Sequence, residues 1–153
     1  MKNTTIILAS DHAGFAHKEA VKKFLQEKGT TVLDVGAHEP IEGDDYPTYM
    51  AAAAIKVAED MKGETKAIIF GGSGQGEAMV ANRFPGVRAV VWYGGSMDIV
   101  KLSREHNDAN VLSIGARFVS EEEVLKAVEL WLATAFSRDE RHVRRIGQID
   151  AIE

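Results

Sequence analysis

The sequence Phe70-Gly71-Gly72-Ser73-Gly74-Gln75-Gly76-Glu77 joins two segments of different character. Residues 67–70, at the end of an apolar run, predict a buried strand. Residues 78–83, which follow the glycines, predict a helix. A buried strand that passes through a short turn into a helix is the repeating unit of parallel α/β sheets, so this stretch indicates that class of fold.

The glycine-rich turn also predicts an anion site. Glycines let the backbone approach a ligand closely, and the helix start beyond them offers unpaired N–H groups and a partial positive charge. Ser73 and Glu77 add a hydroxyl and a carboxylate at the same place, which suggests chemistry on a small anion. Two simpler interpretations stay open: the glycines serve only a tight turn, and Glu77 only stabilises the helix start.

Strand-like and helix-like segments alternate along the whole chain. Apolar, β-rich runs predict five strands, at residues 5–9, 31–35, 67–70, 87–92 and 110–114. Helical patterns predict helices at residues 15–28, 48–61, 78–83 and 96–106, one that starts at Ser120, and one at 138–151. This alternation predicts a doubly wound, Rossmann-like sheet of five parallel strands in a three-layer αβα sandwich. No linker or repeat divides the chain, so we expect one domain, residues 1–153.

The polar residues are predicted to gather on one rim of that sheet, because ligands bind outside the carboxyl ends of parallel strands. The rule selects the loops after the first, third, fourth and fifth strands, which hold Asp11-His12 and residues 71–77, 93–96 and 115–117. We expect residues 106–108, at a helix end, on the same rim, where a histidine suits proton transfer near neutral pH. Asp11 and His106 also suit plainer roles, as a turn former and as a cation at a helix C-terminus.

The C-terminal segment is basic although the chain as a whole is acidic. Arg141 and Arg145 lie one helical turn apart within the predicted helix 138–151. Two guanidinium groups in that arrangement can hold a phosphate. The alternative is a solvated basic face that pairs with Asp139 or Glu140.

Composition excludes several function classes. The chain of 153 residues has a net charge of −5, which gives no electrostatic footprint for nucleic acid, and no cysteine, which excludes disulfides and thiolate metal sites. Its five histidines show no close ligand spacing, so we expect no metal. The glycine turn matches neither a dinucleotide fingerprint nor a P-loop. The apolar run within residues 1–9 is too short for a signal peptide or a membrane span, so we expect a cytoplasmic protein without a membrane partner.

Taken together, these segments resemble the type B ribose-5-phosphate isomerases, a family that includes the galactose-6-phosphate isomerase subunits. The likeness runs nearly end to end, with order and spacing kept. It rests on Ser10-Asp11-His12-Ala13-Gly14, Asp45-Tyr46-Pro47, Gly72-Ser73-Gly74-Gln75-Gly76, Ala81-Asn82-Arg83, Arg88-Ala89, residues 106–112, Gly115-Ala116-Arg117 and residues 141–145.

One position assigns the chain to a subgroup. In many members a cysteine just before the glycine loop is the base that removes the proton from carbon 2, and Gly71 stands at that position here. The chain is similar to the subgroup that has glycine there and a glutamate after the loop. The resemblance therefore implies that Glu77 is the base, which agrees with a sequence that offers no cysteine.

The resemblance implies an aldose–ketose isomerase that interconverts D-ribose 5-phosphate and D-ribulose 5-phosphate through a cis-enediolate. Asp11 and His106 would open the sugar ring, and the Ser73 hydroxyl would help Glu77 by stabilising the enediolate. The substrate would also contact His12, Tyr46, Asn107 and the backbone of Gly72, Gly74 and Gly76. Its phosphate would be bound by Arg117, Arg141, His142 and Arg145. No metal or organic cofactor is implied, because the same proton leaves and returns.

The resemblance further implies a small-molecule sugar phosphate as the partner and a homodimer, or a tetramer, with the active site between subunits. Two other functions stay open at this point. One is an isomerase of a six-carbon sugar phosphate, such as allose or galactose 6-phosphate. The other is a sugar-phosphate-binding module without catalytic activity.

Overall fold

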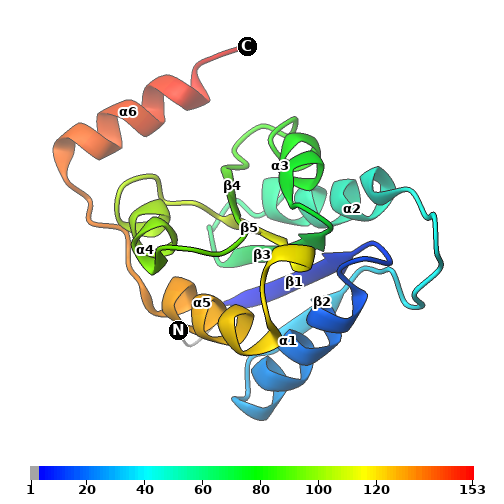
Figure 1. Ribbon diagram of the computed structural model, residues 1–153. Helices are drawn as coiled ribbons and strands as arrows, with labels where there is room; N and C mark the ends of the chain where they lie inside the picture. Colours follow the sequence, from blue (N-terminus) through cyan, green and yellow to red (C-terminus); the bar gives the residue numbers. More distant parts are fainter. Residues whose placement is uncertain (1–3) are drawn as a thin grey trace.

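The computed structural model describes residues 4–153, so the first three residues of the N-terminal run lie outside it. Five parallel strands form one sheet in the order β2-β1-β3-β5-β4 (Figure 1). The strands are β1 (Thr5–Ser10), β2 (Thr31–Asp34), β3 (Thr65–Gly71), β4 (Ala89–Trp92) and β5 (Val111–Gly115). The predicted five-stranded parallel sheet is confirmed.

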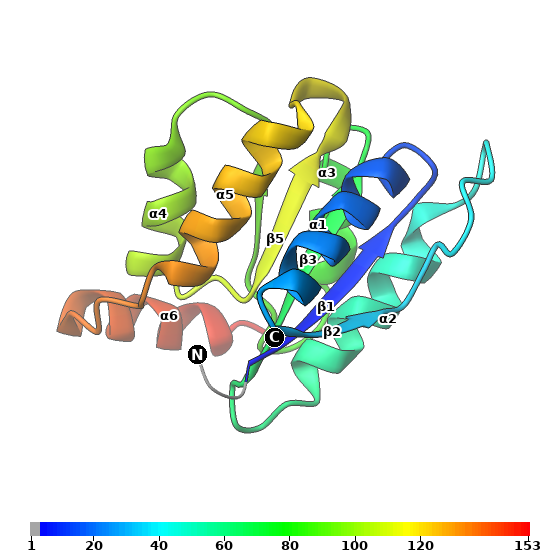
Figure 2. The same ribbon diagram turned by 90° about the horizontal axis from the view of Figure 1, so that it is seen from below.

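Helices cover both faces of this sheet (Figures 1 and 2). One face carries α1 (Phe15–Glu27), α4 (Met97–Glu105) and α5 (Glu121–Ala133), and the other carries α2 (Tyr46–Ala58) and α3 (Gln75–Ala81). Alternate residues of the central strand β3 point to opposite faces, so Ile68 and Phe70 enter one core while Ile69 enters the other. The predicted three-layer αβα sandwich is confirmed.

Helix ends follow the local chemistry more closely than apolar spacing does. Helix α2 begins at Tyr46, two residues earlier than predicted, because Pro47 fits the first turn of a helix. Helix α5 begins with a capping box, in which the Ser120 hydroxyl accepts from the Glu123 N–H at 3.2 Å and the Glu123 carboxylate accepts from the Ser120 N–H at 2.7 Å. The last helix, α6 (Glu140–Asp150), starts later than the predicted residue 138, because Arg138 has a left-handed φ of 60°.

Helix α6 lies outside the three layers, beyond α4 (Figure 1). The ring of His142 stacks on that of His106, with centroids 4.2 Å apart, and Asp150 lies 3.8 Å from the Arg88 guanidinium. Val143 and Ile149 of α6 are about half exposed. Helix α6 therefore presents apolar side chains to the outside of the single chain. Within residues 4–153, no helix combines the length and the apolar character that a bilayer crossing requires.

Candidate active site

The candidate site forms where the chain direction reverses across the sheet. From β1 the chain passes outward to β2, and then returns to β3 on the other side of β1, so the loops after β1 and β3 flank the switch point at which parallel sheets bind ligands. The two strands stay in register up to their ends, where Ser10 pairs with Phe70. The N–H of Asp11 then donates to the Phe70 carbonyl at 3.3 Å. This contact places Asp11 beside the glycine turn, as predicted.

The glycine turn is packed against the end of β5. Gly74 directly precedes α3 and has a φ of +79°, a left-handed backbone conformation that favours glycine. A side chain there would meet the backbone of Gly115 at 3.1 Å, and the Ser113 hydroxyl donates to the Gly74 carbonyl at 2.6 Å. The turn is therefore held at a fixed distance from β5, with Ser73 half-buried on it.

Glu77 lies in the first turn of α3 and is only 4% exposed. Its carboxyl covers the Cα of Gly71, so a methyl group at position 71 would overlap the carboxyl. Burial raises the pKa of Glu77 above its ordinary value, and the charge of nearby Asp11 raises it further. Asp11 is itself buried and accepts a hydrogen bond from the Gly14 N–H at 3.0 Å. Two buried carboxyl groups therefore lie near each other at this edge of the sheet, and Glu77 holds a proton more tightly than an ordinary glutamate does.

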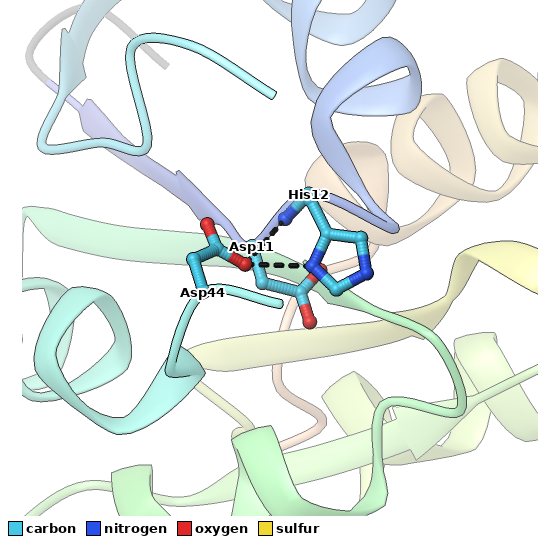
Figure 3. Close-up of side chains that lie close together, drawn as sticks. All are labelled: Asp11, His12 and Asp44. Carbon is cyan, nitrogen blue, oxygen red and sulfur yellow. Dashed lines mark hydrogen bonds and ion pairs between the residues drawn. The ribbon is translucent and has the colours of Figure 1, made fainter. Parts of the chain in front are cut away.

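His12 is held by a residue that the sequence analysis did not single out (Figure 3). The Asp44 Oδ1 atom accepts from the His12 backbone N–H at 3.0 Å and lies 2.7 Å from the His12 Nδ1 atom. Asp44 lies in the loop after β2, which the sequence analysis left out when it selected loops at the carboxyl ends of the strands. Its position at a strand's carboxyl end, directly before the Asp45-Tyr46-Pro47 motif, was the available signal.

Asp11, His12 and Asp44 bring potential ligand atoms within 4.8 Å of one another. The His12 Nδ1 atom, however, is already hydrogen-bonded to Asp44. We therefore interpret the group as a hydrogen-bonded pair beside a second carboxylate and assign no metal to it.

Tyr46 and Arg117 border the glycine turn from two directions. The Tyr46 hydroxyl packs against Gly76 from the start of α2. Arg117 lies in the 3₁₀ turn after β5, and its backbone N–H donates to the Gly72 carbonyl at 3.2 Å. A methyl group added at Gly72 would lie 3.0 Å from the Nη1 atom of the Arg117 side chain. The guanidinium of Arg117 therefore lies over the turn, where it adds a positive charge beside the backbone N–H groups.

The expectation that residues 106–108 share this rim was wrong. Helix α4 starts after the carboxyl end of β4 and returns the chain to the amino edge of the sheet, where β5 begins. There the Asn110 carbonyl accepts from Ala67 N–H at 2.9 Å, and the Asn107 carbonyl accepts from Arg88 Nε at 3.1 Å. His106 and Asn107 are therefore separated from Glu77 by the length of a strand, roughly 15 Å.

The C-terminal residues lie with His106 and not with Glu77. His142 is buried against the His106 ring, and burial, followed by the charges of His106 and Arg141, lowers the pKa of His142. Arg141 and Arg145 are exposed on α6. Within one chain, the structure thus gathers Asp11, His12, Tyr46, residues 71–77 and Arg117 at the carboxyl edge, and it leaves His106, Asn107, Arg141, His142 and Arg145 elsewhere.

Comparison with known proteins places this chain in a family. A family model described as Ribose/Galactose Isomerase matches residues 6–149. A ribose-5-phosphate isomerase B of Mycolicibacterium paratuberculosis is 39% identical over 142 residues, which cover 92% of this chain and 86% of that protein. The ribose-5-phosphate isomerase B of Escherichia coli is 38% identical over 149 residues, covering 97% and 95% of the two chains.

Solved structures agree with this assignment. The crystal structure of ribose-5-phosphate isomerase B from Mycoplasma genitalium, with bound ribulose-5-phosphate, superimposes with a TM-score of 0.91 at 35% identity and covers 96% of this chain and 94% of that one. The corresponding isomerase from Thermotoga maritima gives a TM-score of 0.88 at 36% identity, with 97% and 99% of the chains covered. The chain therefore belongs to the ribose/galactose isomerase family.

Proposed function

We propose that this protein interconverts D-ribose 5-phosphate and D-ribulose 5-phosphate, with Glu77 as the base that moves the proton. The relatives named above are ribose-5-phosphate isomerases, and one of them holds ribulose-5-phosphate. The carboxyl edge of this chain supplies what such a reaction needs: a buried carboxyl, backbone N–H groups and a cation. The assignment of individual residues rests on that geometry.

The overlap between Gly71 and Glu77 is the observation that supports this base most strongly. In family members with a cysteine before the glycine loop, that cysteine stands where this chain has Gly71, so its thiol projects from this position. Here the Glu77 carboxyl fills the space directly over Gly71. The Glu77 carboxylate in that space would take the role of base that a thiolate has in those relatives. Its raised pKa suits a group that must first accept a proton and then return it.

The isomerisation then proceeds on the opened sugar. Glu77 removes the proton from carbon 2, and the electron pair forms the enediolate while negative charge develops on oxygen. Backbone N–H groups of residues 72–76 and the Ser73 hydroxyl stabilise this charge, and a donor in such a position is typically worth about 3 kcal/mol in the transition state. Glu77 then delivers the proton to carbon 1 while the proton of the carbon-2 hydroxyl passes to the oxygen on carbon 1, and no cofactor is needed because no electrons leave the substrate.

We further propose a homodimer in which each site combines two chains. Asp11 opens the ring together with His106, yet these residues lie at opposite edges of one sheet. Two copies related by a two-fold axis can bring these residues together. The amino edge and α6 of each copy would then face the carboxyl edge of the other copy. The second copy would supply Asn107 to the enediolate, and Arg141, His142 and Arg145 to the phosphate, which Arg117 and His12 of the first copy would also bind.

The exposed surface supports that arrangement. Val143 and Ile149 on α6 are about half exposed, and Met79 on α3 is 67% exposed beside the glycine turn. Contact between copies would cover these apolar side chains. The choice between dimer and tetramer and the cytoplasmic location both stay predictions.

The test is turnover by the purified protein. D-ribose 5-phosphate is mixed with enzyme and the ketose is followed by NMR, with D-allose 6-phosphate and D-galactose 6-phosphate as comparison substrates. We expect the pentose to have the highest kcat/KM. Equal or better turnover of a six-carbon substrate would reassign the substrate, and the absence of turnover on all three would overturn the proposal.

A further inference from the structure

We propose that Asp44 is a positioning residue that fixes the ring of His12 and the place of its proton, so that His12 binds the substrate phosphate through Nε2 only when the ring is positively charged. The inference rests on the proposed function, because it concerns the phosphate of that substrate. It assigns a role to the loop after β2, which the mechanism above does not use.

The geometry of the pair constrains the ring in two ways. One oxygen of Asp44 accepts from the backbone N–H of His12 at 3.0 Å and lies 2.7 Å from the Nδ1 atom of its ring, so the ring is tied to its own main chain (Figure 3). The Asp44 side chain is only 7% exposed, whereas 27% of the His12 side chain remains open to solvent. The Nδ1 side of the ring is therefore occupied, and Nε2 is left for a ligand.

The loop that carries Asp44 is anchored at its start. Lys18 is fully buried, and its ammonium donates to the Ala37 carbonyl at 2.6 Å and to the Asp34 carboxylate at 2.7 Å. The Ala37 N–H in turn donates to the Ser10 carbonyl at 2.7 Å, two residues before His12. The beginning of the loop is therefore bound to the end of β1, the strand that leads into His12.

The proton placement follows from the acceptor. An ionised carboxylate only accepts hydrogen bonds, so Nδ1 carries the proton that points to Asp44. In the neutral ring, Nε2 then has a lone pair, which cannot bind a phosphate oxygen. In the charged ring, Nε2 also carries a proton and donates to it. The contribution of His12 to phosphate binding must therefore disappear as pH rises.

Two further groups from other segments face the His12–Asp44 pair. Asp11 comes from the end of β1, with a carboxylate oxygen within 4.8 Å of the pair. Tyr49 comes from α2, where burial, followed by the charge of Asp44, raises the pKa of its phenol. Tyr49 therefore keeps its proton over the pH range of interest, and no third charge enters from α2.

The first test reads the proton without any turnover. Nitrogen-15 NMR of the ligand-free protein, with His12→Gln to assign the signals, distinguishes the two neutral forms of the ring. We expect the neutral His12 ring to carry its proton on Nδ1, and the proton to move to Nε2 in Asp44→Ala. A wild-type ring protonated on Nε2 would overturn the proposal, whatever the protein's substrate is.

The second test is kinetic. KM for D-ribose 5-phosphate is measured as a function of pH on both sides of neutrality. In the wild type KM should rise with pH. In Asp44→Ala, KM at the lower pH should be about tenfold higher, as expected when a hydrogen bond to a charged group is weakened. The dependence on pH should also be flatter, because the freed neutral ring can donate from Nε2.

Asp44→Asn is the conservative variant, since its amide oxygen still accepts from both N–H groups and should restore the wild-type dependence on pH. Glu42→Ala removes an exposed acid from the same loop and serves as the matched control. Superimposable KM profiles for wild type and Asp44→Ala would refute the role of Asp44 even in an enzyme that turns over ribose 5-phosphate. Loss of all turnover in the wild type would instead refute the proposed function and leave the NMR result to decide on Asp44.

Discussion

Gly71→Ala should slow the reaction strongly although it removes no functional group. The added methyl group would overlap the Glu77 carboxyl, which must move by roughly 1.5 Å to reach ordinary contact distance. A displacement of about 1 Å in a catalytic group can cost 10²-fold in rate. We therefore expect kcat to fall about a hundredfold, equivalent to about 2.7 kcal/mol in the barrier, with little change in KM.

The assay is steady-state conversion of D-ribose 5-phosphate, with thermal unfolding measured on the same samples. Gly63→Ala is the matched control. Gly63 lies in an exposed turn with a φ of +70° and open space around its Cα, so alanine there brings backbone strain of about 1 kcal/mol or more without a clash. This control should lose stability and keep its kcat. A folded Gly71→Ala enzyme with kcat within about threefold of wild type would refute the steric link between position 71 and Glu77.

Three further predictions concern the dimer, the phosphate and the buried acid. An equal mixture of Glu77→Gln and His106→Asn chains, refolded together, should regain about a quarter of wild-type activity, because half the dimers are mixed and each has one intact site. Arg117→Ala should raise KM by about tenfold or more and change kcat little, because it removes a charge-assisted contact to the phosphate. Glu77→Gln should melt at a higher temperature than wild type, by a margin that grows as pH rises. The raised pKa makes the native state hold this proton more tightly than the unfolded chain, so the wild type loses stability as pH rises from 4.5 through the native pKa of Glu77.

Each of these has a clear contrary outcome. Activity in the mixture no higher than that of the two parents would show that no site is shared between chains. A drop in kcat at unchanged KM would move Arg117 from the phosphate to the reacting carbons. A melting difference that shrinks with rising pH would show that Glu77 ionises readily when the chain is folded.

The sheet was predictable because its evidence is local. Strands β1, β3 and β4 contain unbroken apolar runs of four residues, at 6–9, 67–70 and Ala89–Trp92, and each of these runs became a strand of the parallel sheet. The ends of helices were harder to predict from the sequence, because they depend on single residues. Pro47 lies in the first turn of α2, and the left-handed backbone at Arg138 precedes α6. Spacing of apolar residues carries no information on either feature.

The site was predictable only where it follows directly from strand ends. Asp11, Glu77 and Arg117 each follow a strand, and the parallel topology brings them together. His106 failed this logic because it ends a helix that returns to the other edge, and its predicted place on the same rim ignored the direction of that helix. Asp44 was missed because only the loops after the other four strands were selected, and because its contact with His12 spans 32 positions of sequence.

The most direct test of Glu77 as the base follows the hydrogen at carbon 2. D-ribose 5-phosphate that carries deuterium at carbon 2 is incubated with wild-type enzyme and with Glu77→Gln, and loss of label to water is measured beside substrate binding by calorimetry. We predict label loss during wild-type turnover, and in the variant a fall of roughly 10²- to 10⁴-fold in label loss with binding retained. Label loss in Glu77→Gln at a rate near that of wild type would show that another group removes the proton.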